Sequence, residues 1–179
     1  MNGYTITQAW QGYYGNVTGT IHLADAANNV MYNWSNMNPQ GEVYASVANN
    51  IDWSQIECFN WTENGVALET NYGIEQDDVD GVNETFKDSN DHTEFYVANK
   101  KFSEGECMAV FLFENGQSVN QRFQEVLLSS GSNVVFASLL ERDRIGFDNR
   151  PHDFQMIVLE DGHKDNIATT TYYFWVELD

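Results

Sequence analysis

Apolar and polar residues alternate along much of this chain, as they do in β-strands that bury one face. Between Val17 and Leu23 the odd positions hold Val, Gly, Ile and Leu, while the even positions hold Thr, Thr and His. The same alternation runs from Val43 to Val47. Because successive side chains of a strand point to opposite faces, both segments are predicted to be strands. Similar reasoning predicts strands at Tyr4–Trp10, Val30–Trp34, Ile51–Trp61, Val66–Thr70, Glu94–Ala98, Cys107–Phe113, Val134–Leu140, Phe154–Leu159 and Thr169–Leu178.

Turn sequences of one kind separate several of these segments. The chain contains TENG at Thr62–Gly65, FENG at Phe113–Gly116 and LEDG at Leu159–Gly162. Asn-Gly and Asp-Gly between apolar segments readily adopt the positive φ angles of a two-residue hairpin loop. The sequence therefore predicts three β-hairpins.

One segment has helical spacing instead. In SVNQRFQEVLLSSG, the apolar residues Val119, Phe123, Val126 and Leu127 share one side of a helix that would lie near 118–130. A strand is the alternative, since Val119, Phe123 and Leu127 also fit a period of two.

Together these patterns predict an all-β single domain over residues 1–179. Its architecture would be an antiparallel β-sandwich of jelly-roll type or a closely related barrel, with at most one short helix near 118–130.

The charge distribution excludes two classes of partner. Asp and Glu number 27 against eight Lys and Arg, which gives a net charge of −19, and Lys87 is the first Lys or Arg in the chain. Nucleic acids and anionic membranes are bound largely through basic side chains that neutralise phosphates. We therefore expect neither as a partner. No apolar run is long enough for a membrane-spanning helix, so none is predicted.

The two cysteines, Cys58 and Cys107, leave two alternatives open. They would pair in an oxidising compartment, or remain buried thiols that act as small apolar residues. No signal peptide is visible at the start of the sequence. An extracellular or cell-surface location is the expectation.

An acidic segment from Ile74 to Phe95 is the candidate metal site. Calcium takes six to eight oxygen ligands, which carboxylates, amides and backbone carbonyls supply. The predicted ligands are Asp77, Asp78, Asp80, Asp88 and Asp91. The spacing does not match an EF-hand, because Gln76 would occupy the first ligand position and Lys87 the last. The alternative is a solvated acidic connection without a metal.

Aromatic residues crowd the part of the chain that precedes Lys87, and they are the candidate ligand-binding residues. Aromatic faces can cover the apolar C–H patches of a sugar while nearby amides and carboxylates bind its hydroxyls. The candidates are Trp10, Tyr13, Tyr14, Trp34 and Trp61. Core and cross-strand packing is the alternative role for each of them. Trp10, Tyr13 and Tyr14, which lie just outside the predicted strands or at their end, are expected to be the more exposed.

The sequence carries no nucleophile elbow, zinc-protease motif or phosphate-binding glycine loop. The functional prediction is therefore a non-enzymatic, lectin-like binding or adhesion module for a neutral ligand, with carbohydrate preferred and Ca²⁺ as its candidate cofactor. Two alternatives remain. One is a β-barrel enzyme that encloses a small organic substrate and uses Asp, Glu or Tyr as acid or base. The other is a structural, self-assembling acidic protein.

Overall fold

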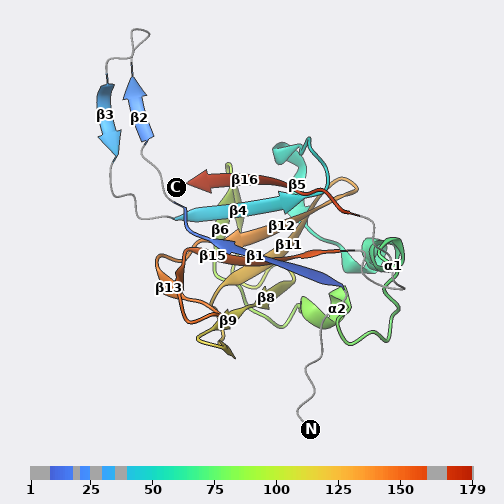
Figure 1. Ribbon diagram of the computed structural model, residues 1–179. Helices are drawn as coiled ribbons and strands as arrows, with labels where there is room; N and C mark the ends of the chain where they lie inside the picture. Colours follow the sequence, from blue (N-terminus) through green and yellow to red (C-terminus); the bar gives the residue numbers. More distant parts are fainter. Residues whose placement is uncertain (1–8, 18–20, 25–29, 35–39, 161–168, 179) are drawn as a thin grey trace.

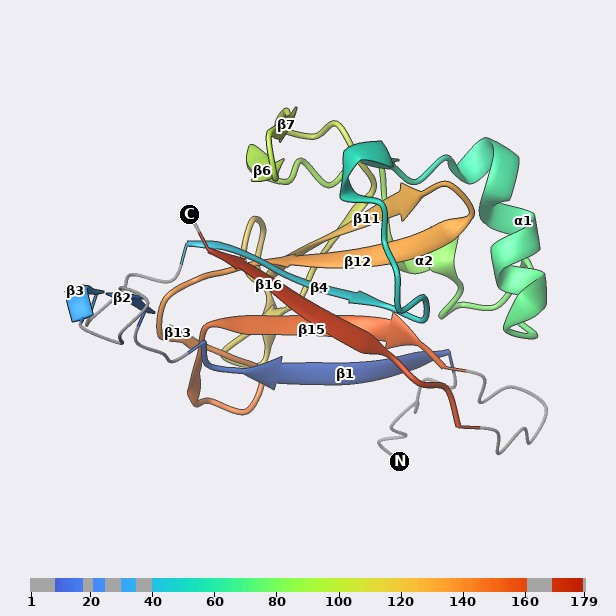
Figure 2. The same cartoon turned by 90° about the horizontal axis from the view of Figure 1, so that it is seen from above.

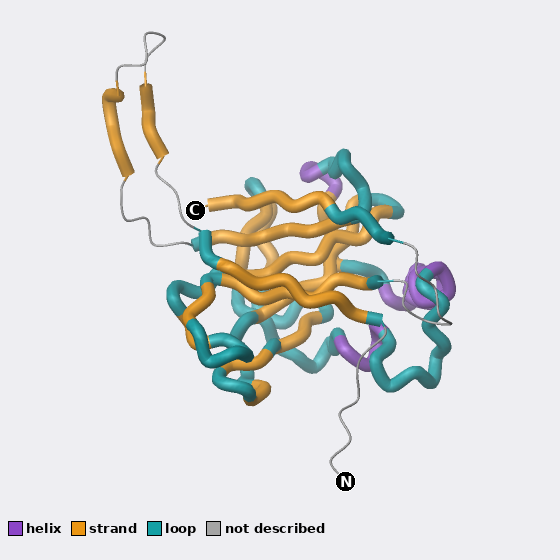
Figure 3. Tube along the Cα trace, in the orientation of Figure 1, coloured by secondary structure: helices purple, strands orange, loops and turns teal. Residues whose placement is uncertain are grey.

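The structure, a computed structural model, describes residues 9–17, 21–24, 30–34, 40–160 and 169–178. Strands account for most of its elements, and the helical segments gather at one end of them (Figures 1 and 3). The strands are β1 Trp10–Gly15, β2 Ile21–Ala24, β3 Val30–Trp34, β4 Gly41–Ser46, β5 Ile56–Cys58, β6 Phe95–Val97, β7 Lys100–Phe102, β8 Ala109–Phe111, β9 Phe113–Glu114, β10 Gln117–Ser118, β11 Gln124–Ser130, β12 Asn133–Leu139, β13 Arg144–Ile145, β14 Pro151–His152, β15 Phe154–Leu159 and β16 Tyr173–Leu178. The helices are α1 Trp61–Asn71 and α2 Val82–Thr85, with a 3-10 turn at Trp53–Gln55.

A six-stranded antiparallel sheet forms the centre of the molecule. Its strand order is β16-β4-β12-β11-β5, and β8 pairs with β11 beside β5. Both short strands thus share one edge of β11: β8 faces residues 124–126 and β5 faces residues 128–130. The antiparallel all-β prediction is confirmed, whereas the jelly-roll or barrel arrangement remains a prediction.

The central sheet is covered on both faces. On β11, Leu127 belongs to one hydrophobic core, while Val126 and Leu128 belong to a second one on the opposite face. On β12, Phe136 lies with Leu127, and Val135 lies with the second core. All seven residues of β11 are buried. Period-two alternation of polarity is absent from this strand because neither of its faces meets water.

The first core lies between the central sheet and a two-stranded layer. This layer consists of β1 and β15, which run antiparallel from Trp10 opposite Leu159 to Gly15 opposite Phe154. Figure 2 shows it lying alongside the strands of the central sheet, and β15 contacts both β12 and β11. Helix α1 closes this core at the end where β15 finishes (Figure 2).

The second core lies on the other face of the sheet, beneath the β6–β7 hairpin. Phe95 and Phe102 of this hairpin stack with ring centres 4.9 Å apart. Cys58 and Cys107 form a disulfide whose Cα atoms are 5.1 Å apart. Of the two alternatives for these cysteines, pairing is therefore the one observed. The bond ties β5 to the segment that leads into β8, and so joins the two short strands on the edge of β11.

Three local predictions are wrong. The segment near 118–130 is not a helix: it contains the end of β10 and all of β11. Conversely, the predicted hairpin at Thr62–Gly65 and the strand at Val66–Thr70 are parts of α1. Asn60 caps this helix, since its side-chain oxygen accepts a hydrogen bond from the Glu63 backbone N–H at 3.3 Å.

Gly65 has a packing role inside α1 rather than a turn role. A Cβ atom at this position would lie 2.5 Å from the indole ring of Trp61, so only glycine allows the ring to cover the helix. The hairpin predicted at Phe113–Gly116 is confirmed, because β9 and β10 pair there and Asn115 and Gly116 have φ angles of 50° and 72°. The hairpin predicted at Leu159–Gly162 extends beyond the described residues.

Candidate functional site

Two of the predicted ligand-binding residues, Tyr13 and Tyr14, lie on β1 at the surface. Tyr13 is 38% exposed and Tyr14 is 52% exposed. They sit opposite Met156 and Gln155 of β15 in the antiparallel register. Because they are neighbours on one strand, their side chains point to opposite faces of β1: the Tyr13 ring packs on Phe174 of β16, with ring centres 5.1 Å apart, while the Tyr14 ring packs on Phe147.

A cavity of about 500 Å³ opens beside these tyrosines, and we call it the tyrosine pocket. Strands β1 and β15 form one wall, and the segment from β8 into β9 forms another. The described residues that line it are Gln11, Gly12, Tyr13, Tyr14, Thr85, Val110, Phe111, Leu112, Phe113, Phe147, Gln155, Met156 and Ile157. None of these residues carries a formal charge. The volume lies within the range of about 300 to 1,000 Å³ that is usual for small-ligand sites.

Tyr14 belongs to an aromatic group at the rim of the tyrosine pocket. Its ring centre lies 5.0 Å from that of Phe147, at 73°, and 4.8 Å from that of His152, at 56°. Phe147 is also exposed, whereas His152 is buried beneath the two rings. The His152 Nε2 atom lies 2.8 Å from a carboxylate oxygen of Asp148. These contacts limit the movement of Tyr14 and leave part of its face open to solvent.

Gln155 holds two walls of the tyrosine pocket together. Its side-chain oxygen accepts a hydrogen bond from the Phe147 backbone N–H at 2.8 Å, and its side-chain nitrogen donates to the Phe113 carbonyl at 2.8 Å. Gly146 allows this arrangement, because a Cβ atom there would lie 2.7 Å from the Gln155 side-chain oxygen and 2.6 Å from the His152 ring. Sequence reasoning missed Phe147 and Gln155, and no local pattern in the chain marks either residue as part of a site.

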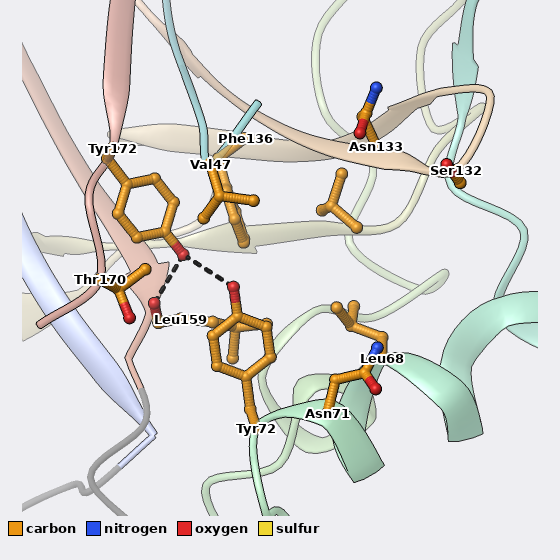
Figure 4. Close-up of a pocket in the computed structure, with 11 residues that line it drawn as sticks. Val47, Leu68, Asn71, Tyr72, Ser132, Asn133, Phe136, Leu159, Thr170 and Tyr172 are labelled. Atoms are coloured by element: carbon orange, nitrogen blue, oxygen red, sulfur yellow. Dashed lines mark hydrogen bonds between the residues drawn. The ribbon is translucent and has the colours of Figure 1, made fainter. Parts of the chain in front are cut away.

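A second uncharged cavity, of about 370 Å³, lies between α1 and the sheets. We call it the helix-side cavity. Figure 4 shows Tyr72 from the end of α1 and Tyr172 from the approach to β16 facing each other across it, with their hydroxyl oxygens 3.5 Å apart. Tyr172 donates to the Leu159 carbonyl at 2.6 Å. Burial, and next the hydrogen bond with Tyr72, raises the pKa of Tyr172 above its usual value. The Tyr172 phenol is therefore a neutral hydrogen-bonding group here.

The three predicted tryptophans are placed differently from the tyrosines. Trp10 is buried, at 8% exposure, and its expected exposure is wrong: the ring packs on Phe86 and Phe136 in the first core. Trp61 begins α1 and packs against the same core. Trp34 ends β3, and its side chain lies outside the described part of the structure. None of the three lines the tyrosine pocket among its described residues.

The predicted calcium ligands do not come together. In the part of the chain that the structure describes, no group of three or more His, Cys, Asp and Glu side chains is arranged to hold a metal ion. Asp78 accepts a hydrogen bond from the Glu75 backbone N–H at 2.7 Å, and the Asp80 carbonyl accepts one from the Trp10 indole N–H at 2.6 Å. The Asp91 backbone carbonyl accepts from Gln121 at 3.2 Å. Asp77 and Asp88 are exposed. Calcium binding remains a prediction from the sequence.

A buried carboxyl group was not anticipated from the sequence. Glu125 of β11 is completely buried, and one of its oxygens, Oε2, accepts a hydrogen bond from the Ile157 backbone N–H at 2.8 Å. Its other oxygen, Oε1, has no hydrogen-bond partner among the described residues. Burial raises the pKa of Glu125 well above its usual value, and the hydrogen bond from Ile157 opposes this only in part. Ile157 and Val110, which neighbour Glu125 across β15 and β8, both line the tyrosine pocket.

Comparison with protein-family models, with curated proteins and with solved structures finds no match for this chain. Within the described residues, no helix combines the length and the apolar character that crossing a membrane would require. The function of this chain is therefore inferred from the geometry of its cavities alone.

Proposed function

We propose that this chain is a non-enzymatic binding or adhesion module for a neutral ligand, and that carbohydrate is the preferred ligand class. The observation that carries this proposal is the tyrosine pocket, an uncharged cavity that Tyr13 and Tyr14 line and that has the paired, exposed rings of Tyr14 and Phe147 at its rim. Uncharged walls disfavour an ionic ligand. Such a ligand loses its hydration water on entering the pocket, and the walls supply no opposite charge to compensate for that loss.

The chemistry of the pocket suits a sugar in two respects. Flat aromatic faces cover the C–H surface of a pyranose ring, while its hydroxyls need donors and acceptors at the edge. Among the residues that line the pocket, Gln11, Thr85 and Tyr14 carry such groups; the Gln11 amide nitrogen donates to the Gly12 carbonyl and the Thr85 hydroxyl to the Gly81 carbonyl, so these two side chains offer their oxygens as acceptors. The amide of Gln155 is already engaged by backbone atoms, so we assign it a supporting role. The helix-side cavity, with Asn71, Asn133, Tyr72 and Tyr172 in its walls, offers a second place for an uncharged ligand.

A glycan array followed by calorimetry on the best ligand tests the proposal. Tyr14→Ala should weaken binding by about tenfold, because it removes an aromatic face that contacts the sugar. Tyr96→Ala is the matched control: Tyr96 is 42% exposed and lies on the β6–β7 hairpin, away from the pocket. Equal losses in the two variants, or no binding across the array, would contradict the proposal.

The enzymatic alternative rests on one observation, the perturbed carboxyl of Glu125 behind the wall of the tyrosine pocket. Perturbed carboxyl groups next to a cavity are characteristic of acid–base sites, although structural carboxyls also show them. Mass spectrometry of the purified protein under non-denaturing conditions separates the two functions. A retained small organic molecule, combined with silence on the glycan array, would favour a β-barrel enzyme that encloses its substrate.

Location and calcium complete the proposal. The disulfide between Cys58 and Cys107 supports an oxidising compartment, and an extracellular or cell-surface module fits that setting. Calcium, held by carboxylates of the segment from Ile74 to Phe95, would act by ordering this segment rather than by contacting the ligand, since none of its aspartates lines the tyrosine pocket among the residues described.

A further inference from the structure

A third cavity, of about 320 Å³, combines aromatic walls with a carboxylate, unlike the two uncharged cavities. We call it the carboxylate pocket. Its described lining residues are Tyr44, Trp53, Ala98, Trp175, Val176 and Glu177. Tyr44 belongs to the second core, so this pocket lies on the opposite face of the central sheet from the first core and the tyrosine pocket. Any ligand that it takes is therefore independent of the carbohydrate proposal.

Three aromatic rings form the corner of the carboxylate pocket. The ring centres of Tyr44 and Trp53 are 4.9 Å apart at 54°, and those of Trp53 and Trp175 are 5.6 Å apart at 78°. Rings inclined at such angles make walls instead of a flat stack. Tyr44 is buried at 2% exposure, whereas Trp53 and Trp175 are partly exposed, so a group placed beside the two indoles can lie within about 6 Å of both, which is the range of a cation–π contact.

The negative charge of the pocket comes from Glu177 of β16. One of its oxygens accepts a hydrogen bond from the Tyr44 hydroxyl at 2.9 Å, and the other accepts from the Ala98 backbone N–H at 2.9 Å. Glu42 lies opposite Glu177 in the β4–β16 register, and the Tyr44 hydroxyl also lies 3.3 Å from its carboxylate. Burial, and next the charge of Glu42, raises the pKa of Tyr44, so its phenol stays protonated as the donor. Both donors to Glu177 are neutral, and its negative charge is not cancelled by them.

No basic side chain compensates this charge within the described residues. Neither Lys, Arg nor His forms an ion pair with Glu177 there. Lys100, two residues after Ala98, donates to the Ile56 carbonyl at 2.6 Å, and its ammonium nitrogen lies 5.2 Å from the centre of the Phe102 ring. The chain thus already places one ammonium group against an aromatic ring and an oxygen, and the carboxylate pocket offers the same two partners without a resident cation.

We propose that the carboxylate pocket binds an organic ammonium group, with a methylated quaternary ammonium as its best ligand. Methyl groups spread the positive charge over an apolar surface, so such a cation loses little hydration when aromatic rings surround it. Glu177 supplies the opposite charge at the edge of the corner. A metal ion does not suit this pocket, because rings are not metal ligands and the residues described provide no group of three ligating side chains.

Choline and its uncharged isostere 3,3-dimethylbutanol provide the most direct test, since the two differ in charge and hardly in shape. Tryptophan fluorescence or calorimetry on the unmodified protein should show saturable binding of choline and about tenfold weaker binding of the isostere. Equal affinity for the two compounds, or no saturable binding of choline, would overturn the proposal. A parallel titration with acetylated trimethyllysine amide shows by its relative affinity whether the pocket prefers a free metabolite or a protein side chain.

Two variants assign the effect to the pocket. Glu177→Gln removes the charge and keeps one acceptor oxygen, which in the place of Oε2 lies 2.9 Å from the Tyr44 hydroxyl and 3.2 Å from the Ala98 nitrogen, and it should weaken choline binding by about tenfold. Glu63→Gln, the same change at an exposed position on α1, controls for the loss of one negative charge and should leave choline binding unchanged. Melting curves confirm that each variant is folded. If Glu63→Gln weakens binding as much as Glu177→Gln does, the effect is one of net charge, and the proposed pocket is wrong.

Discussion

Replacing Glu125 by glutamine should remove a part of the pH dependence of folding. In the folded chain burial raises the pKa of Glu125 above the ordinary value of 4.5. Between the unfolded and the folded pKa, the native state therefore binds more protons at this group than the unfolded chain does. Stability consequently falls as the pH rises through this interval, and it is highest, as far as Glu125 is concerned, below the unfolded pKa.

The size of this pH dependence follows from the single proton that Glu125 binds. While the pH lies between the two pKa values, the free energy of unfolding decreases by up to about 1.4 kcal/mol per pH unit because of Glu125. Glutamine keeps an oxygen that can accept the hydrogen bond from the Ile157 backbone N–H. Its NH2 group then takes the position of Oε1, where the described residues offer no hydrogen-bond partner. An unsatisfied donor costs about 1 to 3 kcal/mol, and this cost does not change with pH. The slope, rather than the absolute stability, is thus the informative quantity.

Urea unfolding followed by tryptophan fluorescence, from pH 4 to pH 8 at constant ionic strength, measures this slope. The stability difference between Glu125→Gln and the unmodified chain should increase in favour of the variant above pH 4.5, the ordinary value. Glu57→Gln, at an exposed position on the neighbouring strand β5, controls for the loss of one charge. Parallel curves for the unmodified chain and Glu125→Gln would refute the reasoning, since they would mean that the carboxyl titrates alike in both states.

Three further outcomes are expected. Replacing Cys58 and Cys107 by serine should lower the free energy of unfolding by about 2 to 4 kcal/mol, because their disulfide closes a loop across a separation of 49 residues. Urea unfolding of the serine variant, and of the unmodified chain with and without reductant, measures this loss. Gly65→Ala should destabilise the chain by about 1 to 3 kcal/mol despite its better helix propensity, since the new Cβ meets the Trp61 ring; thermal melting that shows a gain instead would contradict this. Calcium at about 100 times its Kd should add about 2.7 kcal/mol of stability if the segment from Ile74 to Phe95 binds it, and a melting shift no larger than that of Mg²⁺ at equal ionic strength would remove the calcium proposal.

Strand β4 was predictable from the sequence, and β11 was not. Alternation indicated the segment around Val43, which became β4: both faces of β4 are buried too, but Tyr44 and Ser46 alternate with Val43 and Ala45 and keep the pattern of a strand. In β11 both faces are covered, so its apolar residues follow one another and imitate helical spacing. The Asn-Gly pair before Val66 misled for a different reason: Asn60 starts a helix upstream, and Gly65 is needed there for the contact with Trp61. Local turn propensity was overruled by tertiary packing.

The candidate site was predictable only in part. Tyr13 and Tyr14 are exposed and line the tyrosine pocket, although their side chains point to opposite faces of β1, whereas Trp10 on the same strand is in the core. The register of β1 with β15 decides which rings reach the surface. This register cannot be read from the sequence of a single chain. Phe147 and Gln155 come from distant segments that only the fold brings beside β1. Their contribution depends on pairings over long sequence separations, which a local pattern cannot encode.

The shared edge of β11 has a practical consequence for handling this protein. Strands β5 and β8 each cover three residues of that edge, and the disulfide next to them keeps both in place. Reducing agents break this disulfide, so β5 and β8 can detach from the sheet. The backbone donors and acceptors on that edge of β11 are then unpaired. Storage with thiols should therefore promote aggregation of the protein, visible as a slow rise in light scattering.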